Sequence, residues 1–537
     1  MSKGLFTEQQ STFVPAALLV LARIANMVIS LGMIPVLIHF LGGGGFAAWA
    51  MLLAISAAFS ALEIGMAQTF IKHAAPLIQQ RNWLHVNIVL SQAAIILLVA
   101  FALAAPLVFW LAGDVARSLQ LPDDEWLSAK QMILFVYMSV ALRAVLQFGA
   151  HTFNAARRFR ALAAVSFLQS FAANCAATVA AILTGRVDIT LIAFWGSQIV
   201  VMIATIIAAR RFYAWGLGPA MPRLGMLREM ISHGLKIQVC DWAQIINFQF
   251  DKFLIASYMG LWTVAPYEVA NRSVLALRSV PSSGLDSFLA TAVIGRESGD
   301  DPWPRYQTVT RLAVLAVVVF MLAPLAVAPV FLYAWTGEMG YSARWVFLFL
   351  LLGAAGSLLA LPAALMAQAA GRADIQARSA IVSMLVNIPL SIILMLEWDM
   401  AGAATGTAIA MLTGSAMLLV QVHRAYGRPM SATIMNMGQS WPLFIVCLAF
   451  GALVYHPFEL WLTSLDATVR YSWETRLYLG LATAAAYFAC LATIAIVQIH
   501  RGALSRDQYD FLSRWIQFKW FVAYCATKAP SQREMAS

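Results

Sequence analysis

The chain has 537 residues, of which 61% are hydrophobic and only 11% are charged, and its formal net charge is +10. Because about a quarter of the residues of a soluble domain are charged, this composition excludes a mainly soluble protein and predicts an all-α integral membrane protein. The basic excess is typical of cytoplasmic loops in membrane proteins, so we expect no nucleic-acid partner. The five cysteines lack the spacing of a disulfide framework or a zinc site, so no metal is expected.

Apolar stretches follow one another along almost the whole chain. A helical span needs about 20 mostly apolar residues, and about 14 transmembrane helices are predicted by that criterion. They lie at 13–40, 46–71, 84–112, 130–152, 160–183, 189–209, 234–258, 262–292, 308–335, 343–369, 377–396, 401–422, 441–461 and 477–499. The connections are short, so we expect no inserted globular domain.

Basic residues are distributed unequally between alternate loops. Counted from a cytoplasmic N-terminus, inside loops such as those with Arg158 and Arg372 outweigh outside loops by about four to one in Lys and Arg. This bias predicts that both termini are cytoplasmic. The tail, 501–537, mixes basic and aromatic residues, so it is interpreted either as an amphipathic helix on the inner membrane surface or as a loosely ordered basic tail.

Two stretches of the chain resemble each other. "FLGGGGFAAWAML" (40–52) and "YMGLWTVAPYEVA" (258–270) align without a gap and pair Gly42 with Gly260. Repeated halves are typical of transporters with a site near mid-membrane, although hydrophobic segments can also match by chance. We predict two pseudo-symmetric six-helix bundles around a central cavity plus two C-terminal helices. The predicted parts are a cytoplasmic N-terminus (1–12), the bundles (13–230 and 231–425), the two added helices (426–500) and the tail (501–537).

Several predicted spans contain charged residues, each of which costs at least about 2–3 kcal/mol in a bilayer. The candidate substrate-binding residues are Arg23, Arg143, Lys252, Arg272 and Arg278. The candidate ion-coupling residues are Glu63, Asp241, Asp251 and Glu268, although Glu63 could equally be a helix-end carboxylate. In the span 234–258, polar residues recur every three or four positions and predict one polar face, formed by Gln238, Asp241, Gln244, Asn247 and Asp251.

Two explanations of these charges stay open. They can line a watery cavity, or they can form buried ion pairs that hold helices together, as Glu268 and Arg272 could at i, i+4. Stripes on several helices favour the cavity. There, the planar guanidinium of arginine would suit an anionic substrate, especially a diphosphate, and the carboxylates could couple transport to H⁺ or Na⁺. No other cofactor is expected.

Three segments carry a family resemblance, namely 40–75, 250–272 and 371–410. Their order and spacing resemble the multidrug/oligosaccharidyl-lipid/polysaccharide (MOP) exporter superfamily, and within it the polysaccharide transport family of Wzx-type flippases. The chain is also similar to lipid II flippases, which have fourteen spans and arginines matching Arg23 and Arg272. It departs from many family members in having only glycines in "GGGGF" and glutamate at Glu63.

This resemblance implies a flippase that turns an undecaprenyl-diphosphate-linked oligosaccharide from the inner to the outer leaflet of a bacterial inner membrane. The glycan would be a repeat unit of exopolysaccharide, capsule or O-antigen. The implied partners are this lipid-linked glycan, membrane lipids and a polysaccharide polymerase or export machinery. The alternatives are a lipid II flippase, then an ion-coupled multidrug exporter or a membrane glycosyltransferase. Because the acidic loop "LPDDEW" (121–126) has no partner motif, no enzyme activity is expected.

Overall fold

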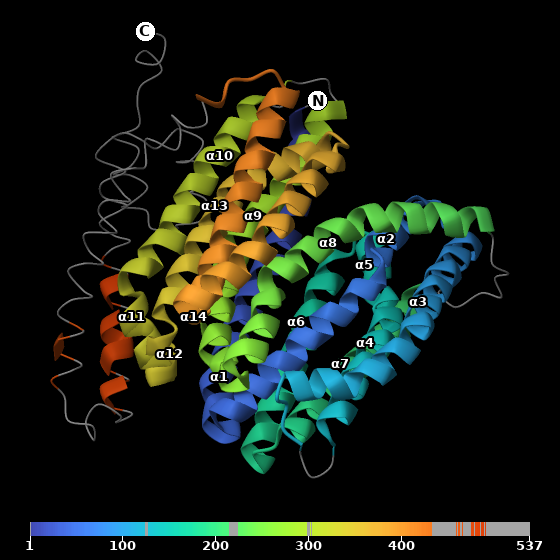
Figure 1. The fold of residues 1–537 in the computed structure, drawn as a ribbon. Coiled ribbons are helices and arrows are strands. Elements are labelled where there is room, and N and C mark those ends of the chain that lie inside the picture. Colours follow the sequence, from blue (N-terminus) through green and yellow to red (C-terminus); the bar gives the residue numbers. More distant parts are fainter. Residues whose placement is uncertain are drawn as a thin grey trace, which may run out of the picture. The chain divides into compact units, whose positions relative to one another are not determined.

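The computed structural model describes residues 2–431, except 124–126, 214–223, 298–300 and 302, and parts of 458–489. Within these residues the chain forms helices and no strand, as Figure 1 shows, so the predicted all-α class is confirmed. Eight of the described helices are long and apolar enough to cross a membrane. The protein is therefore a multi-pass membrane protein, while the count of fourteen spans stays a prediction.

The chain divides into two compact units, Met1–Val280 with Gln376–Gly414, and Pro281–Ile375 with Ser415–Ser537. Unit 1 holds α1 (Ser2–Ser60), η1 (Ala61–Glu63), α2 (Met66–Gln79), α3 (Trp83–Ser118), α4 (Ala129–Leu146), α5 (Phe148–Ala155), α6 (Phe159–Thr184), α7 (Val187–Phe212), α8 (Leu224–Met259), η2 (Leu261–Thr263), the first half of α9 (Val264–Glu297) and the middle of α14 (Ala373–Ala425). Unit 2 holds the rest of α9 and α14, with α10 (Trp303–Val317), the π-helix η3 (Val318–Leu322), α11 (Ala323–Thr336), α12 (Glu338–Ser342) and α13 (Arg344–Ala369). The bundle boundaries predicted from the sequence stay a prediction.

The first two predicted spans are joined inside α1. The helix breaks at Gly42, whose φ of 71° and ψ of 170° suit a residue without a Cβ. The second predicted span is itself discontinuous, because η1 is followed by left-handed Ile64 and Gly65 before α2 begins. A broken helix inside a membrane needs other partners for its freed backbone groups. Here the amide of Gly65 donates to Oε1 of Gln238 on α8 over 2.7 Å.

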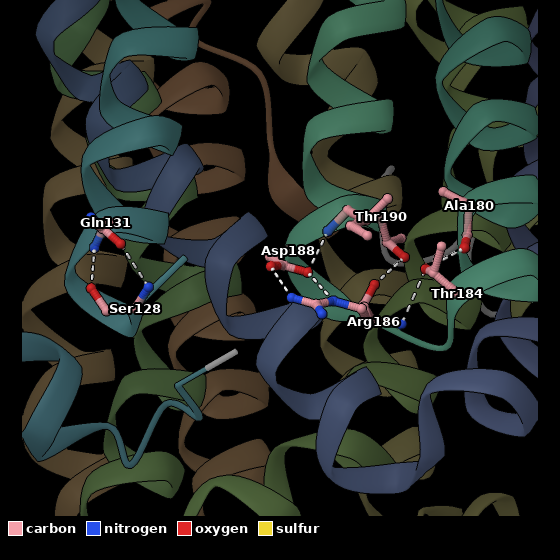
Figure 2. A network of polar contacts seen from close by, with 8 residues as sticks. Ser128, Gln131, Ala180, Thr184, Arg186, Asp188 and Thr190 are labelled. Atoms are coloured by element: carbon pink, nitrogen blue, oxygen red, sulfur yellow. Dashed lines mark hydrogen bonds and ion pairs between the residues drawn. The ribbon is translucent and has the colours of Figure 1, made fainter. Parts of the chain in front are cut away.

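Polar contacts fix the turn between α6 and α7, which pack along each other in unit 1 (Figure 1). Figure 2 shows Arg186 and Asp188 facing each other at the start of α7, with Nη2 and Oδ2 2.8 Å apart. Asp188 is fully buried, and its Oδ1 also accepts from the amide of Ile189 at 2.7 Å. The hydroxyl of Thr190 donates to the carbonyl of Arg186 over 2.6 Å. The buried carboxylate thus pairs with Arg186 and satisfies one amide of the first turn of α7.

The long helix α14 consists of two helices that reverse direction at Trp398 and Asp399, where the backbone is not helical. The break falls between the predicted spans 377–396 and 401–422. After the break, a Cβ at Gly402 would collide with the carbonyl of Leu394, and one at Gly406 would lie 2.5 Å from the amide nitrogen of Ser391. Glycine at these two positions therefore allows the two halves of α14 to pack at backbone distance.

Unit 2 has its own core and its own polar contacts. Trp303, Tyr306 and His423 belong to one buried cluster, in which the hydroxyl of Tyr306 lies 3.3 Å from Nε2 of His423. Arg476 donates to the carbonyl of Trp335 over 2.9 Å and so caps the last turn of α11. The predicted span 441–461 and the tail 501–537 lie almost wholly outside the described residues, as does much of 477–499.

Candidate functional site

Three charged residues of unit 1 form a buried triad between α8 and α9. Oε1 of Glu268 lies 2.5 Å from Nε of Arg272, one turn further along α9. Oε2 of the same carboxylate lies 2.5 Å from Nζ of Lys252 on α8. The side chains of Lys252 and Glu268 are each only 3% exposed, so both ions are withdrawn from solvent. A buried charge persists at such a site because its partner offsets part of the desolvation cost.

Arg272 is the member of the triad that keeps access to the surface. Its side chain is 17% exposed. Its Nε is held by Glu268, whereas its two terminal nitrogens make no hydrogen bond to any residue that the structure describes. The guanidinium is therefore anchored at its inner edge and open at its outer edge. This geometry suits the recognition of a phosphate by two parallel N–H groups.

A second cluster surrounds Asp251, the residue directly before Lys252. Oδ2 of this fully buried carboxylate accepts hydrogen bonds from the hydroxyls of Tyr267 and Thr407. Oδ1 is buried and has no hydrogen-bond partner among the described residues. An orphan carboxylate oxygen in a buried site needs an explanation, such as a bound ion or proton.

Neutral oxygens complete the surroundings of Asp251. The amide of Asn387 donates to the hydroxyl of Thr407 over 2.8 Å. The hydroxyl of Ser391 lies 3.2 Å from the carbonyl of Ala403 and 3.5 Å from the hydroxyl of Thr407. One carboxylate among hydroxyl, amide and carbonyl oxygens is the kind of environment that a hard cation prefers.

A third ion pair lies at the break between η1 and α2. Nη2 of Arg143 on α4 is 2.9 Å from Oε1 of Glu63, and each side chain is 23% exposed. The Arg143 guanidinium also lies 5.8 Å from the ring of Trp195. The break is further held by Trp242 of α8, whose indole donates to the carbonyl of Ala61 over 3.2 Å. Arg143 is thus tied to Glu63 in a site apart from the triad on α8 and α9.

The other predicted residues take different positions. The backbone of Arg23 lies in α1, but its side chain is outside the described residues. Arg278 is half-buried, with its guanidinium 5.6 Å from the ring of Phe248. Asp241 is exposed on α8. The structure therefore brings together Lys252, Glu268 and Arg272 with neighbouring Asp251.

The predicted single polar face of α8 is wrong. Gln238, Asn247 and Asp251 are buried, whereas Asp241 and Gln244 are exposed. With 3.6 residues per turn, each step of three residues falls about 60° short of a full turn. Several such steps carry the polar residues around the helix. The two ends of the series therefore meet protein while its middle is exposed.

Sequence reasoning missed two members of the Asp251 cluster, Ser391 and Thr407. Both residues, like Asn387, lie in the segment 371–410 that carries the family resemblance, but the sequence assigned none of them a role. The remaining signal was weak, because serine and threonine in apolar helices usually bond to their own backbone. In α14 the hydroxyl of Thr407 instead donates to Oδ2 of Asp251 over 2.6 Å.

Buried ion pairs, an orphan carboxylate and a broken span within membrane helices are features typical of transporters. The sequence profile of the polysaccharide biosynthesis protein family matches residues 15–294, more than half of the chain. The chain therefore belongs to that family, and the predicted membership of the MOP superfamily is confirmed. The comparison with curated proteins gives no match.

Solved structures with the same fold include transporters of the MOP superfamily. The lipid II flippase MurJ in an inward closed conformation aligns with a TM-score of 0.63 and 13% identity, over 89% of this chain and 100% of MurJ. An inward-facing MATE multidrug resistance transporter aligns with a TM-score of 0.59 and 12% identity, over 76% of this chain and 98% of the transporter. A MOP superfamily transporter from Pyrococcus furiosus aligns with a TM-score of 0.54 and 13% identity, over 76% of this chain and 95% of that transporter. These likenesses establish a transporter fold.

Proposed function

We propose that the protein is a flippase for an undecaprenyl-diphosphate-linked oligosaccharide, a repeat unit of exopolysaccharide, capsule or O-antigen. It would turn this lipid from the inner to the outer leaflet of the bacterial inner membrane by alternating access, with both termini in the cytoplasm. Membership of the polysaccharide biosynthesis protein family supports a lipid-linked glycan as substrate. A polysaccharide polymerase or export machinery would then receive the product.

The main observation behind this proposal is the burial and hydrogen bonding of Arg272. Its guanidinium is half-buried, anchored through Nε and open at both terminal nitrogens within the described residues. A charge-assisted contact to a diphosphate there should contribute about 1.5–3 kcal/mol, or roughly ten- to a hundredfold in affinity. Arg23 is proposed as a second contact, from the resemblance to lipid II flippases. For Arg143 and Arg278 we propose a weaker, longer-range attraction of the anion.

The Asp251 cluster is proposed as the site of the coupling ion. Its orphan Oδ1 and the neutral oxygens of Asn387, Ser391 and Thr407 could hold either Na⁺ or a proton. Glu63 and Asp241 stay candidates for a proton, because both side chains keep access to the solvent from which a proton would come. The bound cation would neutralise the carboxylate when the ion runs down its gradient.

The test of the substrate site compares Arg272→Ala, Arg272→Lys and the double variant Glu268→Ala/Arg272→Ala. Membrane abundance and glycan export are measured for each. We expect Arg272→Ala to abolish or sharply reduce export at normal abundance, and lysine to rescue only partly because it lacks the planar fork. Arg117→Ala is a matched control, since Arg117 pairs with Asp114 of its own helix on an exposed surface at 2.5 Å.

A different result is expected if Arg272 does not bind substrate and only stabilises the fold through its ion pair with Glu268. Removing Arg272 would then leave Glu268 with Lys252 as its ion partner and lower protein abundance, and the double variant would lower it further because the buried Lys252 loses its carboxylate. Normal export by the double variant would contradict substrate binding by Arg272. A lipid II flippase is the second candidate function, favoured by the 100% coverage of MurJ in the structural alignment. Rescue of a strain depleted of lipid II flipping would identify it.

A further inference from the structure

Lys252 is tied into the protein more completely than a substrate-binding lysine would be. Its Nζ lies 2.5 Å from Oε2 of Glu268 and 2.7 Å from Oε1 of Gln249, and its side chain is 3% exposed. A cation held in this way cannot reach a phosphate without breaking both contacts. The expectation that Lys252 binds substrate directly therefore has no geometric support.

Lys252 is nevertheless linked to Arg272, whose terminal nitrogens are open, through a single residue, Glu268. Two consecutive residues of α8 contact two consecutive residues of α9, because Asp251 accepts from Tyr267 while Lys252 pairs with Glu268. Glu268 in turn holds Nε of Arg272 at 2.5 Å. Glu268 is thus shared by two cations, one fully buried and one reaching the surface.

The charges of the triad explain what this sharing does. Lys252 and Arg272 carry one positive charge each and Glu268 carries one negative charge, so the triad has a net charge of +1. Without Lys252 the net charge would be zero, and Glu268 would have only Arg272 as a partner. A carboxylate with a single arginine partner tends to take two parallel N–H groups, which would turn a terminal nitrogen of Arg272 inward.

We propose that Lys252 is a positioning residue. It neutralises Glu268 so that Glu268 orients Arg272 through Nε alone and leaves the terminal nitrogens and one net positive charge for the diphosphate. This inference rests on the proposed function, because it assumes that Arg272 binds the substrate. It assigns Lys252 a role through Arg272 rather than a contact with the lipid.

The experiment measures equilibrium binding of radiolabelled undecaprenyl diphosphate to the purified full-length protein in nanodiscs. Undecaprenol, which lacks the phosphates, serves as the uncharged ligand control. The variants are Lys252→Met, Glu268→Gln and the double Lys252→Met/Glu268→Gln, whose triads carry net charges of 0, +2 and +1. Lys130→Met is the matched control, because Lys130 lies over the ring of Phe109 at 4.3 Å, outside the triad.

We expect affinity to follow the charge of the triad. Lys252→Met should bind about tenfold more weakly or worse, the double variant should return to near the original affinity, and Glu268→Gln should bind at least as tightly as the unchanged protein. A merely structural role of Lys252 would not let Glu268→Gln, which breaks the same ion pair, keep or gain affinity. Weaker binding by Glu268→Gln overturns the proposal even if Lys252→Met does not fold.

Measuring Arg272→Ala in parallel distinguishes a failure of the proposed substrate site from a failure of the proposed role of Lys252. If Arg272→Ala binds weakly while Lys252→Met binds like the unchanged protein, the role of Lys252 is refuted and the proposed substrate site stands. If Arg272→Ala binds normally, the proposed substrate site is refuted, and the role of Lys252 is refuted with it.

Discussion

The hydroxyl of Thr407 donates a hydrogen bond of 2.6 Å to Oδ2 of Asp251, although 156 residues separate the two in the sequence. This bond joins the second half of α14 to α8 inside unit 1. It occupies one carboxylate oxygen and leaves Oδ1 without a partner among the described residues. Oδ2 of Asp251 thus has a structural role, whereas Oδ1 is available to a cation.

Replacing Asp251 by asparagine should uncouple transport from its driving ion. Asparagine keeps the shape and one oxygen but loses the charge that a cation needs, so flipping driven by a Na⁺ or proton gradient should fall about tenfold or more. The measurement is lipid flipping in proteoliposomes with and without each gradient. The control is Asp399→Asn, because Asp399 is exposed and its positive φ of 51° suits asparagine. Gradient-driven flipping that survives in Asp251→Asn would contradict the ion site.

Replacing Gly406 by alanine should destabilise the hairpin of α14. The new Cβ would lie 2.5 Å from the backbone nitrogen and 2.7 Å from Cα of Ser391, neither of which can move freely. Such overpacking typically costs about 1–3 kcal/mol. The melting temperature of the purified protein should therefore fall. Gly196→Ala in α7 is the control, since nothing lies within 4 Å of its Cβ, and an equal loss in both variants would refute the close packing.

Replacing Gln238 by leucine should weaken the break in the second span. Oε1 of Gln238 accepts from the amide of Gly65 at 2.7 Å, and leucine would leave that amide unpaired at a cost of about 1–3 kcal/mol. Thermal unfolding in detergent should detect the loss. Gln244→Leu, on an exposed position of the same helix, should leave the melting temperature nearly unchanged. A similar stability of the two variants would show that water or lipid replaces the Gln238 contact.

The orientation of the chain can be tested with single cysteines in a background without the five natural ones. Cysteines at Arg158 and Arg372 should be shielded from an impermeant thiol reagent in intact cells, and one at Asp123 should be labelled. Permeabilised cells should label all three positions, which controls for accessibility. The reverse pattern in intact cells would place the termini outside and reverse the proposed direction of transport.

The helices were predictable because their signal is local. Apolar runs bounded by polar turns indicated the breaks that the structure shows at Gly42 and at Trp398–Asp399. The pairing of Glu268 with Arg272 was also foreseeable, since residues at i, i+4 face each other on any helix. The break at Ile64 and Gly65 was foreseeable only in part, because the reading of Glu63 as a helix-end carboxylate did not reveal the side chain of α8 that stabilises the break.

The site was predictable only in part, because its contacts join distant segments. The sequence marked Lys252 as an intramembrane charge, but its ion pair with Glu268 depends on the register between α8 and α9. That register decides which of two consecutive residues, Asp251 or Lys252, meets which partner. Periodicity along one helix carries no such information, and this is why Lys252 was expected to bind substrate.

The contact between Gly65 and Gln238 also affects the order in which the protein can form its structure during synthesis. The two residues are 173 positions apart, so the broken span is made long before its partner. At a synthesis rate of roughly 5–20 residues per second, the amide of Gly65 waits about 9–35 s for Gln238 to leave the ribosome. During that interval the nascent second span must keep an unpaired amide near water or in a straighter helix. Its final bent form is therefore a late product of biosynthesis, completed only when α8 arrives.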